Sequence, residues 1–396
     1  MKIAVVVNTF PSASQTFIAT QVDELVRQGH EVEIFAHGME RGVHHAVVAR
    51  VLEYCRVTYF RFPRQAYHLI EFIRWCLYNL PTLFEVANYS RLSAKHFPFF
   101  GMLLKVFYLT KASEQSDAVF SHFAAAGAPF AFIPRTGSTR LLFFHGYDVN
   151  RFPLEVGLTA FAKIIASHDI FISNTEFTKR IAMKNGVPSN RIYSVPVGLN
   201  FSLFPPVEER PRRSRVELIS IGRLVEKKGI EFTIRACGIL LASGFSEFRY
   251  TIVGDGPLKD SLAHLAHSLN LHNHVEFKGT ASQEAVRELL SVSDILLMPS
   301  VTASDGDKEG QGLVMQEAQL LEVPVVATDH NGFSEGVVDA ETALLVPERS
   351  PESLASAIKT LCDSDETRRR FGRAGRQFVL KKYDIRFTTA AVLKHI

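Results

Sequence analysis

Apolar and polar positions follow two alternating patterns along the chain. Short runs rich in Val, Ile and Leu alternate with longer stretches whose apolar residues recur at helical spacing. A continuous apolar run is typical of a strand that is covered by helices on both faces, whereas a strand with one wet face alternates residue by residue. The pattern therefore predicts a doubly wound α/β fold with parallel sheets.

The predicted strands fall into two groups. The first group comprises residues 3–7, 32–35, 118–121, 141–144, 169–173 and 192–195. The second group comprises residues 216–222, 250–254, 275–279, 294–300, 323–328 and 343–347. Between them lies FSLFPPVEERPRRSR (201–215), whose prolines and charges are typical of a linker.

We therefore expect two Rossmann-like domains that face each other across a cleft, because open α/β sheets bind ligands beyond the carboxyl ends of their strands. The first would span residues 1–202 and the second residues 203–376, with a C-terminal helix at about 377–396 packing back on the first. No G-x-G-x-x-G follows the first strand, so an NAD-dependent dehydrogenase is a poor fit.

Composition and charge narrow the class of protein. The 396 residues are 46% hydrophobic and 21% charged with a net charge of +3, which predicts a globular protein and does not call for nucleic acid. The four cysteines form no CxxC pair, which favours a reduced, cytoplasmic compartment over disulfides or a zinc site. The first apolar run is too short for a signal peptide, and the run at 97–109 is broken by Gly101 and Lys105, so no membrane-spanning segment is expected.

One region departs from the alternation. Residues 56–111 contain eight Lys or Arg against two Glu, together with fourteen aromatic residues that include the only tryptophan, Trp75. Two interpretations remain open. The region is either a helical insertion whose apolar face joins the core, or a surface for peripheral contact with a membrane, because arginine and aromatic rings both suit the lipid interface.

Two cationic side chains flank the turn after the first strand of the second domain. In GRLVEKKG, Arg223 and Lys228 lie five residues apart. Arginine binds oxygens with a fork of N–H groups and lysine acts as a point charge, so the pair could clamp a diphosphate. An exposed charged turn is the alternative.

Glycines close the next two predicted strands. Gly254 and Gly256 in GDGP, and Gly279 after Lys278 in VEFKG, would let the backbone approach a ligand such as a nucleobase. Ordinary tight turns explain them equally well.

The stretch EGQGLVMQE places an acidic residue on either side of an expected helix start near Leu313. Free N–H groups at a helix start favour an anionic ligand, and Gly310 and Gly312 leave room for it. Glu309 would then lie beside the group attached to the phosphates, and Glu317 would accept hydrogen bonds from hydroxyls on the other side of the ligand. A ligand with hydroxyls on both sides of a diphosphate is a nucleotide sugar.

Asp305, Gly306 and Asp307 form a D-x-D pattern that could hold a divalent cation through its oxygens. We favour a solvated loop, because a lysine follows directly and Arg223 and Lys228 already supply cations for a diphosphate. No metal or other cofactor is therefore expected.

Together these segments resemble a known family. GRLVEKKG, GDGP, the stretch from Glu309 to Glu317, and the following VPVVAT, NGFSEGV and ALLVP are similar to the retaining family 4 glycosyltransferases of the GT-B fold. FPSASQTFI near the start and VTASDGDKEGQGLVMQE resemble more narrowly the bacterial exopolysaccharide branch, including colanic-acid-type enzymes.

The resemblance implies that the second domain binds a nucleotide-sugar donor. Arg223 and Lys228 would neutralise its diphosphate. Glu309 would contact hydroxyls of the donor sugar, and Glu317 would bind the ribose. The further donor contacts are expected at Gly254, Gly256, Lys278, Gly279, Gln311, Gly312 and Leu313.

The resemblance also assigns residues in the first domain, on the acceptor side. FFHGYDV matches the strand-end histidine motif, so His145 would contact the transferring sugar near its anomeric carbon. With Glu309, Arg223 and Lys228 it forms the expected catalytic group. His122, which ends a neighbouring strand, is a second candidate for the acceptor side.

The chain departs from the family pattern at several positions. Many relatives have a glycine-rich loop after the first strand, where this chain has FPSASQTF; Ser12, Ser14 and Thr16 could replace that loop, and Ser14 is the donor contact that we expect. Gln15 stands where the narrower branch often has glutamate. Gln311 stands where phenylalanine is common, which would change the choice of sugar.

The family implies transfer with retention of the anomeric configuration, in which the leaving diphosphate helps to deprotonate the acceptor while the protein orients the reactants and stabilises charge. The expected donor is UDP-glucose or UDP-galactose. The expected acceptor is a growing, lipid-linked exopolysaccharide oligosaccharide, met at the cytoplasmic face of the plasma membrane. The alternatives are a GT-B-fold nucleotide-sugar epimerase and a non-catalytic nucleotide-sugar-binding subunit.

Overall fold

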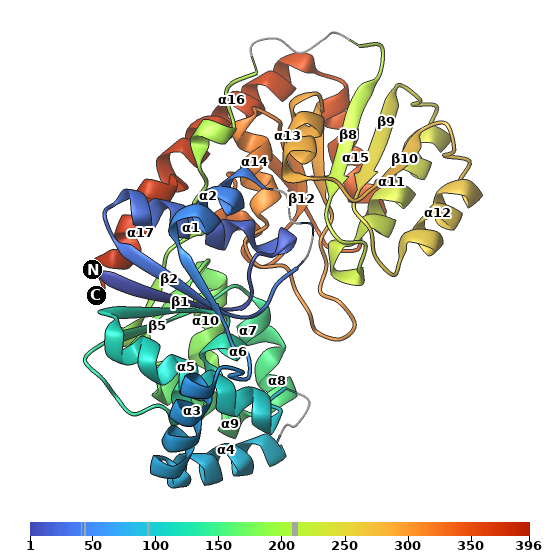
Figure 1. Cartoon of the computed structure of the whole chain (residues 1–396). Coiled ribbons are helices and arrows are strands. Elements are labelled where there is room, and N and C mark those ends of the chain that lie inside the picture. Colours follow the sequence, from blue (N-terminus) through green and yellow to red (C-terminus); the bar gives the residue numbers. More distant parts are fainter. Residues whose placement is uncertain (41, 43–44, 93–95, 208–212) are drawn as a thin grey trace. The chain divides into compact units, whose positions relative to one another are not determined.

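A computed structural model describes residues 1–40, 42, 45–92, 96–207 and 213–396 (Figure 1). They form two compact units, each of which is described by itself. Unit 1 comprises Met1–Gly198 and Arg386–Ile396, and unit 2 comprises Leu199–Ile385.

Unit 1 is built on seven parallel strands in the order β3-β2-β1-β4-β5-β6-β7. The strands are β1 (Lys2–Thr9), β2 (Glu31–Gly38), β3 (Arg56–Tyr59), β4 (Ala118–His122), β5 (Thr139–Phe144), β6 (Ile170–Ser173) and β7 (Ile192–Ser194). The helices are α1 (Thr16–Arg27), α2 (Ala46–Tyr54), α3 (Ala66–Tyr78), α4 (Leu80–Leu92), α5 (Phe99–Gln115), α6 (Ala124–Gly127), α7 (Tyr147–Asn150), α8 (Phe152–Val156), α9 (Leu158–Ala166), α10 (Glu176–Lys184) and α17 (Ile385–Leu393).

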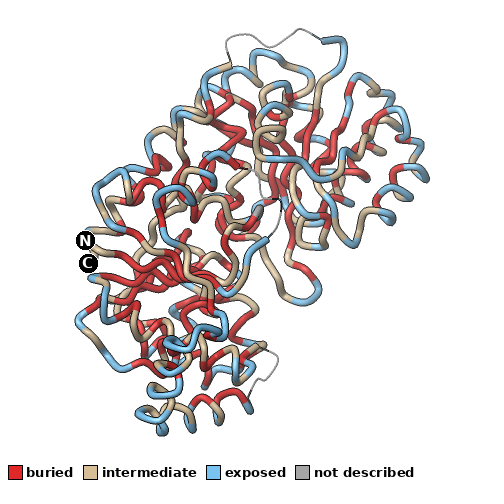
Figure 2. The backbone as a smooth tube through the Cα atoms, in the orientation of Figure 1, coloured by how far each residue is buried: buried red, intermediate tan, exposed pale blue. Residues whose placement is uncertain are grey.

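The central strands of unit 1 are buried on both faces. From Ile3 to Val7, no residue of β1 is more than 1% exposed, which is why this run carries no polar alternation. Figure 2 shows the strands as a red core. The strand order reverses between β1 and β4, and in open α/β sheets such a reversal, at the carboxyl ends of the strands, is where ligands bind.

Unit 2 has six parallel strands in the order β10-β9-β8-β11-β12-β13, so its order reverses between β8 and β11. The strands are β8 (Val216–Ile221), β9 (Phe248–Val253), β10 (Val275–Gly279), β11 (Ile295–Met298), β12 (Val325–Thr328) and β13 (Ala343–Val346). The helices are α11 (Ile230–Ala242), α12 (Lys259–Ser268), α13 (Gln283–Ser291), α14 (Leu313–Leu320), α15 (Pro351–Cys362) and α16 (Asp365–Lys382).

Each face of the unit 2 sheet has its own layer of helices. Leu218 and Tyr250 belong to the core that the sheet forms with α11, α12 and α15. Ile219 and Leu296 belong to a second core with α13, α14 and α16. Because alternate residues of one strand serve different helix layers, the strands have to be apolar throughout.

All twelve predicted strands are present, and the fold class is confirmed. The prediction missed β3, which lies at the edge of the unit 1 sheet and, among the described strands, pairs with β2 alone. Its four residues, RVTY, open the basic and aromatic region for which no strand was predicted, and so short a run carries little periodic signal.

The chain passes from unit 1 to unit 2 at Gly198 rather than at residue 202. The first residues of the predicted linker already belong to unit 2, where a short 3₁₀ turn, Phe201–Leu203, precedes Phe204, which is 3% exposed. Residues 208–212 of that linker lie outside the described part of the chain.

The C-terminal segment returns to unit 1 at Arg386 rather than at about residue 377. The reason is that α16 remains packed on α14. A Cβ on Gly375 of α16 would lie only 3.0 Å from Cγ of Gln319 in α14, so the two helices are in close contact.

Region 56–111 forms β3, α3, α4 and most of α5. Among the described residues, no helix is both long enough and apolar enough to cross a membrane.

Candidate active site

In unit 2, the turn after β8 is shaped around the side chain of Lys228. This side chain passes Gly222, where a Cβ would lie 3.0 Å from Cε of the lysine and where φ is +148°. The turn ends at Gly229, which lies so close to the loop after β11 that a Cβ would be 1.9 Å from the carbonyl oxygen of Pro299. The loops on the two sides of the strand-order reversal are therefore in direct contact.

Lys228 and Glu309 meet at this point, although they are far apart in the sequence. Nζ of Lys228 lies 2.9 Å from Oε2 of Glu309. Burial alone would raise the pKa of Glu309, but Lys228 and Lys227 outweigh it, so the pKa is lowered and the carboxylate stays ionised. The structure thus joins two of the predicted catalytic residues in one ion pair.

Arg223 lies on the same turn in a different environment. Its side chain is exposed, and no carboxylate of the described residues lies within ion-pairing distance of it. Its guanidinium can therefore bind an incoming anion without first breaking an ion pair.

The loop from β11 to α14, which carries Glu309, is tied down near its start. The amide of Thr302 donates to Oε2 of Glu348 at 2.9 Å. The amide and the hydroxyl of Ser304 donate to the carboxylate of Glu226, at 2.9 and 2.6 Å. Both acceptors lie outside the loop, so the loop is held by the body of unit 2.

Asp305 and Asp307 shape the same loop. Asp305 accepts the amide hydrogen of Asp307 at 2.9 Å, and Asp307 pairs with Lys227 at 3.1 Å. Each carboxylate of the D-x-D pattern therefore has a role in the loop itself. In the part of the chain that the structure describes, no group of three His, Cys, Asp or Glu side chains is placed to hold a metal ion.

His330, which the sequence analysis did not single out, holds the backbone of Glu309 in place. It is fully buried, and its Nε2 accepts the amide hydrogen of Glu309 at 3.1 Å. Nδ1 therefore carries the proton and donates to Oε1 of Glu348. Burial lowers the pKa of His330 in spite of Glu348, so the ring stays neutral. The signal that could have found it is its place just after β12, two residues beyond Thr328.

The start of α14 depends on glycine for two reasons. Gly312 is the N-cap with a φ of +71°, and a Cβ there would lie 2.8 Å from the ring of Phe333. Leu313 begins the helix as predicted, and Gln311 beside it is buried. Backbone conformation and packing therefore require Gly312 independently of any ligand.

Glu317 lies on the second turn of α14 and is almost fully buried. Burial raises its pKa to about 7, although Nε2 of Gln283, which donates to it at 3.4 Å, acts in the opposite direction. Near neutral pH its charge is therefore poised to respond to a ligand.

Three predicted donor-site glycines connect the loops after β8, β9 and β10. A Cβ on Gly254 would lie 2.0 Å from the carbonyl oxygen of Gly222, and one on Gly256 would lie 2.5 Å from that of Leu224. The amide of Gly254 donates to the carbonyl of Gly279 at 2.8 Å. Packing of loop against loop explains Gly254 and Gly256 without a ligand.

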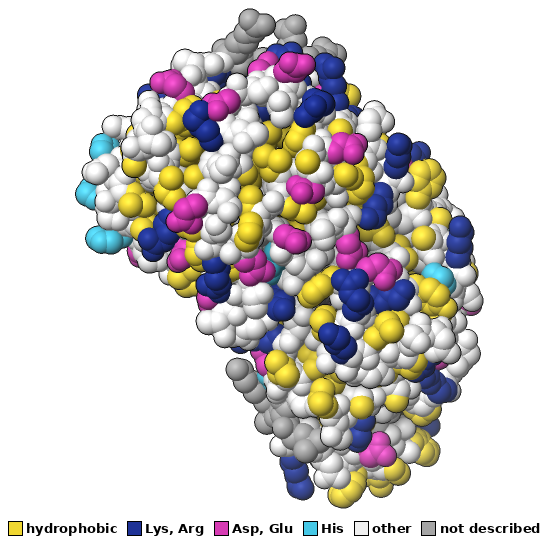
Figure 3. Space-filling model, turned by 180° about the vertical axis from the view of Figure 1, so that it is seen from behind, with side chains coloured by type: hydrophobic (Ala, Val, Ile, Leu, Met, Phe, Trp, Pro, Cys, Tyr) yellow, Lys and Arg dark blue, Asp and Glu magenta, His cyan; other side chains and the backbone are white. Residues whose placement is uncertain are grey.

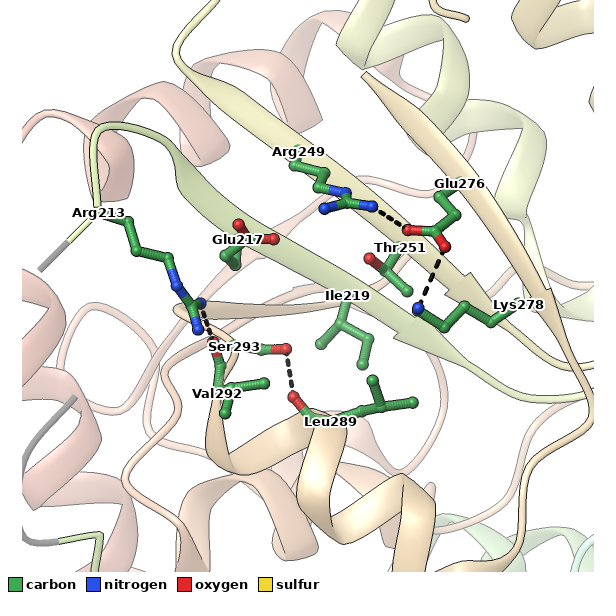
Figure 4. A pocket seen from close by; sticks show the side chains of 10 residues that line it. All are labelled: Arg213, Glu217, Ile219, Arg249, Thr251, Glu276, Lys278, Leu289, Val292 and Ser293. Atoms are coloured by element: carbon green, nitrogen blue, oxygen red, sulfur yellow. Dashed lines mark hydrogen bonds and ion pairs between the residues drawn. The ribbon is translucent and has the colours of Figure 1, made fainter. Parts of the chain in front are cut away.

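The side chain of Lys278 lies apart from this cluster of glycines. Figure 4 shows it on the face of the sheet, in a pocket of about 260 Å³ among β8, β9, β10 and α13. Its Nζ lies 3.1 Å from Oε1 of Glu276, which also pairs with Arg249. A donor contact by this side chain would have to compete with that ion pair.

In unit 1, two histidines lie at the carboxyl ends of neighbouring strands. His122 is the last residue of β4, and His145 follows β5 directly. Their rings stack with centroids 5.4 Å apart, and Nδ1 of His122 lies 3.2 Å from Nε2 of His145. Burial lowers the pKa of His145 to about 3 and that of His122 well below its usual value, so both rings are neutral and one donates to the other.

Asp148, which the sequence analysis also missed, holds the backbone of His145. Its carboxylate accepts the amide hydrogens of His145 at 2.9 Å and of Ala124 at 2.7 Å, so it joins the loops after β4 and β5. Burial raises its pKa to about 6 against the effect of these bonds. Its place three residues after His145 is the only signal that the sequence offers.

Ser14 lies in a short 3₁₀ turn, Ala13–Gln15, between β1 and α1, and its side chain is exposed. Its hydroxyl oxygen is 3.3 Å from that of Ser12. Oε1 of Gln15 is buried with no hydrogen-bond partner among the described residues. Phe17, at the start of α1, packs on the ring of His145 with centroids 4.9 Å apart, so this segment borders the histidine pair.

Two family models match the chain, one for each half. Residues 14–203 match Glycosyltransferase Family 4, and residues 207–378 match Glycosyl transferases group 1. The chain is 28% identical over 372 residues to WcaL of Salmonella typhimurium, which is named for colanic acid biosynthesis, with 90% of each chain covered. It is 26% identical over 378 residues to the amylovoran biosynthesis glycosyltransferase AmsK of Erwinia amylovora, covering 92% of this chain and 91% of AmsK.

A solved structure shares the fold over the full length. HepE of Anabaena, in complex with UDP, has a TM-score of 0.72 and 16% identity, covering 100% of this chain and 99% of its own.

Proposed function

The chain belongs to the family 4 and group 1 glycosyltransferases of the GT-B fold, and from this premise we propose that it transfers a hexose with retention of configuration. The proposed donor is UDP-glucose or UDP-galactose, and the proposed acceptor is a growing, lipid-linked exopolysaccharide oligosaccharide. The observation that carries the proposal is the ion pair of Lys228 with Glu309 at the strand-order reversal of unit 2, beside the exposed Arg223.

Lys228 and Arg223 would supply positive charge to the donor diphosphate. Negative charge grows on this group as the sugar leaves, and fixed cations stabilise it more than they stabilise the bound donor. When Lys228 turns to the phosphate, the carboxylate of Glu309 becomes an acceptor for hydroxyls of the sugar. The protein supplies both cations itself, so we expect transfer to continue in EDTA.

His145 would orient the sugar rather than exchange protons with it. A ring whose pKa is about 3 is neutral under physiological conditions. Its Nε2 is engaged with Nδ1 of His122, so its own Nδ1 is the atom that would hydrogen-bond the sugar. In same-face transfer the leaving diphosphate takes the proton of the acceptor, so no protein nucleophile is required. A neutral imidazole near the anomeric carbon fits that requirement.

The relatives support this class of donor and acceptor. WcaL and AmsK are named for the biosynthesis of colanic acid and amylovoran, and HepE has been solved with UDP. By analogy we place the protein in the cytoplasm, at the inner face of the plasma membrane, where a lipid-linked acceptor would be met.

A thermal-shift panel of UDP-glucose, UDP-galactose, GDP-mannose and UDP tests the donor. The true donor should raise the unfolding temperature, because it binds the folded state. The shift should be smaller in Arg223→Ala and unchanged in Arg235→Ala, an exposed arginine of α11. If no nucleotide sugar shifts the wild type, the donor proposal is wrong.

Product analysis separates transfer from its alternatives. UDP release that depends on an acceptor, with the anomeric configuration read by NMR, supports retaining transfer. Interconversion of the donor alone would indicate an epimerase. Donor binding with neither product would indicate a non-catalytic subunit.

A further inference from the structure

Exposed apolar side chains gather just before α3, along α3 and at the start of α4 in unit 1. We call this group the α3–α4 surface, and it comprises Phe62, Tyr67, Ile70, Ile73, Leu77, Tyr78, Leu80 and Phe84. Figure 3 shows yellow apolar side chains with few magenta carboxylates at the end of unit 1 where Figure 1 labels α4. Scattered exposed apolar residues are normal, but a cluster of this size marks an interaction site.

Helix α3 is apolar on two sides. On its inner side, Phe72 and Trp75 pack against Phe107 of α5, with ring centroids 5.1 and 5.6 Å apart. On its outer side, apolar residues recur every three or four positions, as at Ile70 (57% exposed) and Leu77 (65% exposed), and so form one stripe. Packing within unit 1 explains the inner side, and the outer side is left without a partner among the described residues.

The segments that form this surface also carry exposed cations. Among the described residues of 61–92 these are Arg61, Arg64, Arg74 and Arg91. Of the two glutamates in these helices, Glu71 is paired with Lys111, whose hydrogen bond lowers the pKa of that carboxyl, and Glu85 is exposed. The charge balance of these segments is therefore positive.

The positive charge of the α3–α4 surface decides which of two possible partners would bind it. A second copy of this chain, docked about a two-fold axis, would bring the same arginines against each other, and like charges across an interface oppose association. A bilayer with anionic headgroups attracts arginines at its surface and takes up apolar side chains at the acyl boundary. Tyr67 and Tyr78 suit the same interface, because their rings have an apolar body and a polar tip.

We propose that the α3–α4 surface docks unit 1 on the headgroup region of an anionic lipid bilayer, with its apolar stripe toward the acyl chains. This docking deepens the proposed function and rests on it, because the lipid-linked acceptor would be met at the same bilayer. The docking itself requires neither donor nor acceptor and is tested without them.

Flotation of the full chain with vesicles tests the apolar stripe. Phosphatidylcholine vesicles that contain phosphatidylglycerol should carry the wild type at low salt, and pure phosphatidylcholine vesicles should carry much less. Leu77→Ser combined with Phe84→Ser should reduce partitioning about tenfold. The matched control is Phe387→Ser on α17, because Phe387 is 65% exposed and Phe84 is 69% exposed, and this variant should bind like the wild type.

A second pair of variants tests the charge. Arg64→Ser combined with Arg74→Ser should weaken binding to the anionic vesicles and reduce its dependence on salt. Arg235→Ser on α11 of unit 2 should do neither. All these side chains are exposed, so the unfolding temperatures should match that of the wild type.

The outcomes separate docking from transfer. Docking is overturned if the wild type fails to float with anionic vesicles at low salt, or if the Leu77 and Phe84 variant floats like Phe387→Ser. A wild-type dimer that this variant dissociates would assign the surface to a second copy instead. Transfer to a detergent-soluble acceptor is measured separately: a wild type that floats but transfers nothing contradicts the proposed function alone.

Discussion

Units 1 and 2 arrange six strands in the same order around a reversal, yet the side chains at the two reversals differ in charge. In unit 2 the loops bring together Lys228, Glu309 and the exposed Arg223. In unit 1 they bring together His122 and His145, which stack on each other as neutral rings. The shared topology therefore determines where a site can form, and the loops determine its chemistry.

The partner of each buried group explains the contrast. Burial opposes the charged form at both sites, but at Glu309 two lysines reverse its effect on the pKa. At His145 the nearest titratable ring is another histidine, so burial prevails. Desolvation by itself does not decide whether a strand-end site is charged.

The largest effect should come from removing the cations of unit 2. Lys228→Ala and Arg223→Ala should each lower kcat by roughly 10³-fold, because the charge that develops on the diphosphate loses a fixed partner. Steady-state transfer kinetics would measure this. Arg223→Ala should keep the wild-type unfolding temperature, since this side chain is exposed. Near-normal turnover of both variants would refute the diphosphate clamp.

Removing the neutral ring of unit 1 should have a smaller effect. His145→Ala should lower kcat by roughly 10²-fold through a lost hydrogen bond near the sugar, and His145→Gln should recover part of it. Because burial holds the pKa of His145 at about 3, the ring should cause no step in the pH dependence of kcat between pH 5 and 8. A step in that range that His145→Ala abolishes would show that the ring titrates.

Removing the support beneath Glu309 should affect stability and activity together. His330→Ala removes the hydrogen-bond partner of the Glu309 amide and that of Oε1 of Glu348, which should cost about 2 kcal/mol of unfolding free energy. Urea denaturation would measure it. His330→Gln can both donate and accept, so it should restore part of kcat as well. An alanine variant with wild-type stability and kcat would mean that the contact is unimportant.

The smallest expected effect is the pH dependence of donor affinity. The pKa of Glu317 is raised to about 7, so the carboxyl is mostly protonated at pH 6 and mostly ionised at pH 8. Ribose hydroxyls bind better to the ionised form, so donor affinity by calorimetry should rise about tenfold over that range. Glu317→Gln should bind donor more weakly at pH 8 and lose the dependence on pH. The same slope in the variant would exclude Glu317 as its source.

Sequence patterns predicted the parts of the molecule whose signal is local. Continuous apolar runs identified twelve strands, and motifs pointed to Lys228 and Glu309, which the structure joins. His330 and Asp148 were missed because each accepts a hydrogen bond from a backbone amide on another loop, that of Glu309 and that of Ala124, a relation that leaves no fixed spacing in the sequence. The edge strand β3 was missed because four residues with one neighbour carry little pattern.

The strand-end glycines show a different limit of prediction from the sequence. Gly254 and Gly256 were expected either to let the backbone approach a ligand or to form ordinary tight turns, and the structure places neighbouring backbone where their Cβ atoms would be. A glycine in a strand-end loop signals a close approach. It does not tell whether a ligand or another loop makes that approach.

The hydrogen bonds that hold the loop after β11 have a thermodynamic consequence. Thr302 and Ser304 are held by Glu348 and Glu226 of the same unit, so the chain loses the conformational entropy of this segment when it folds. Donor binding then does not carry the free-energy cost of ordering this loop. The heat-capacity change of donor binding should therefore be that of docking to a rigid surface. Donor preference would accordingly reside in individual side chains such as Gln311, which makes the specificity of this site open to redesign by substitution on a fixed backbone.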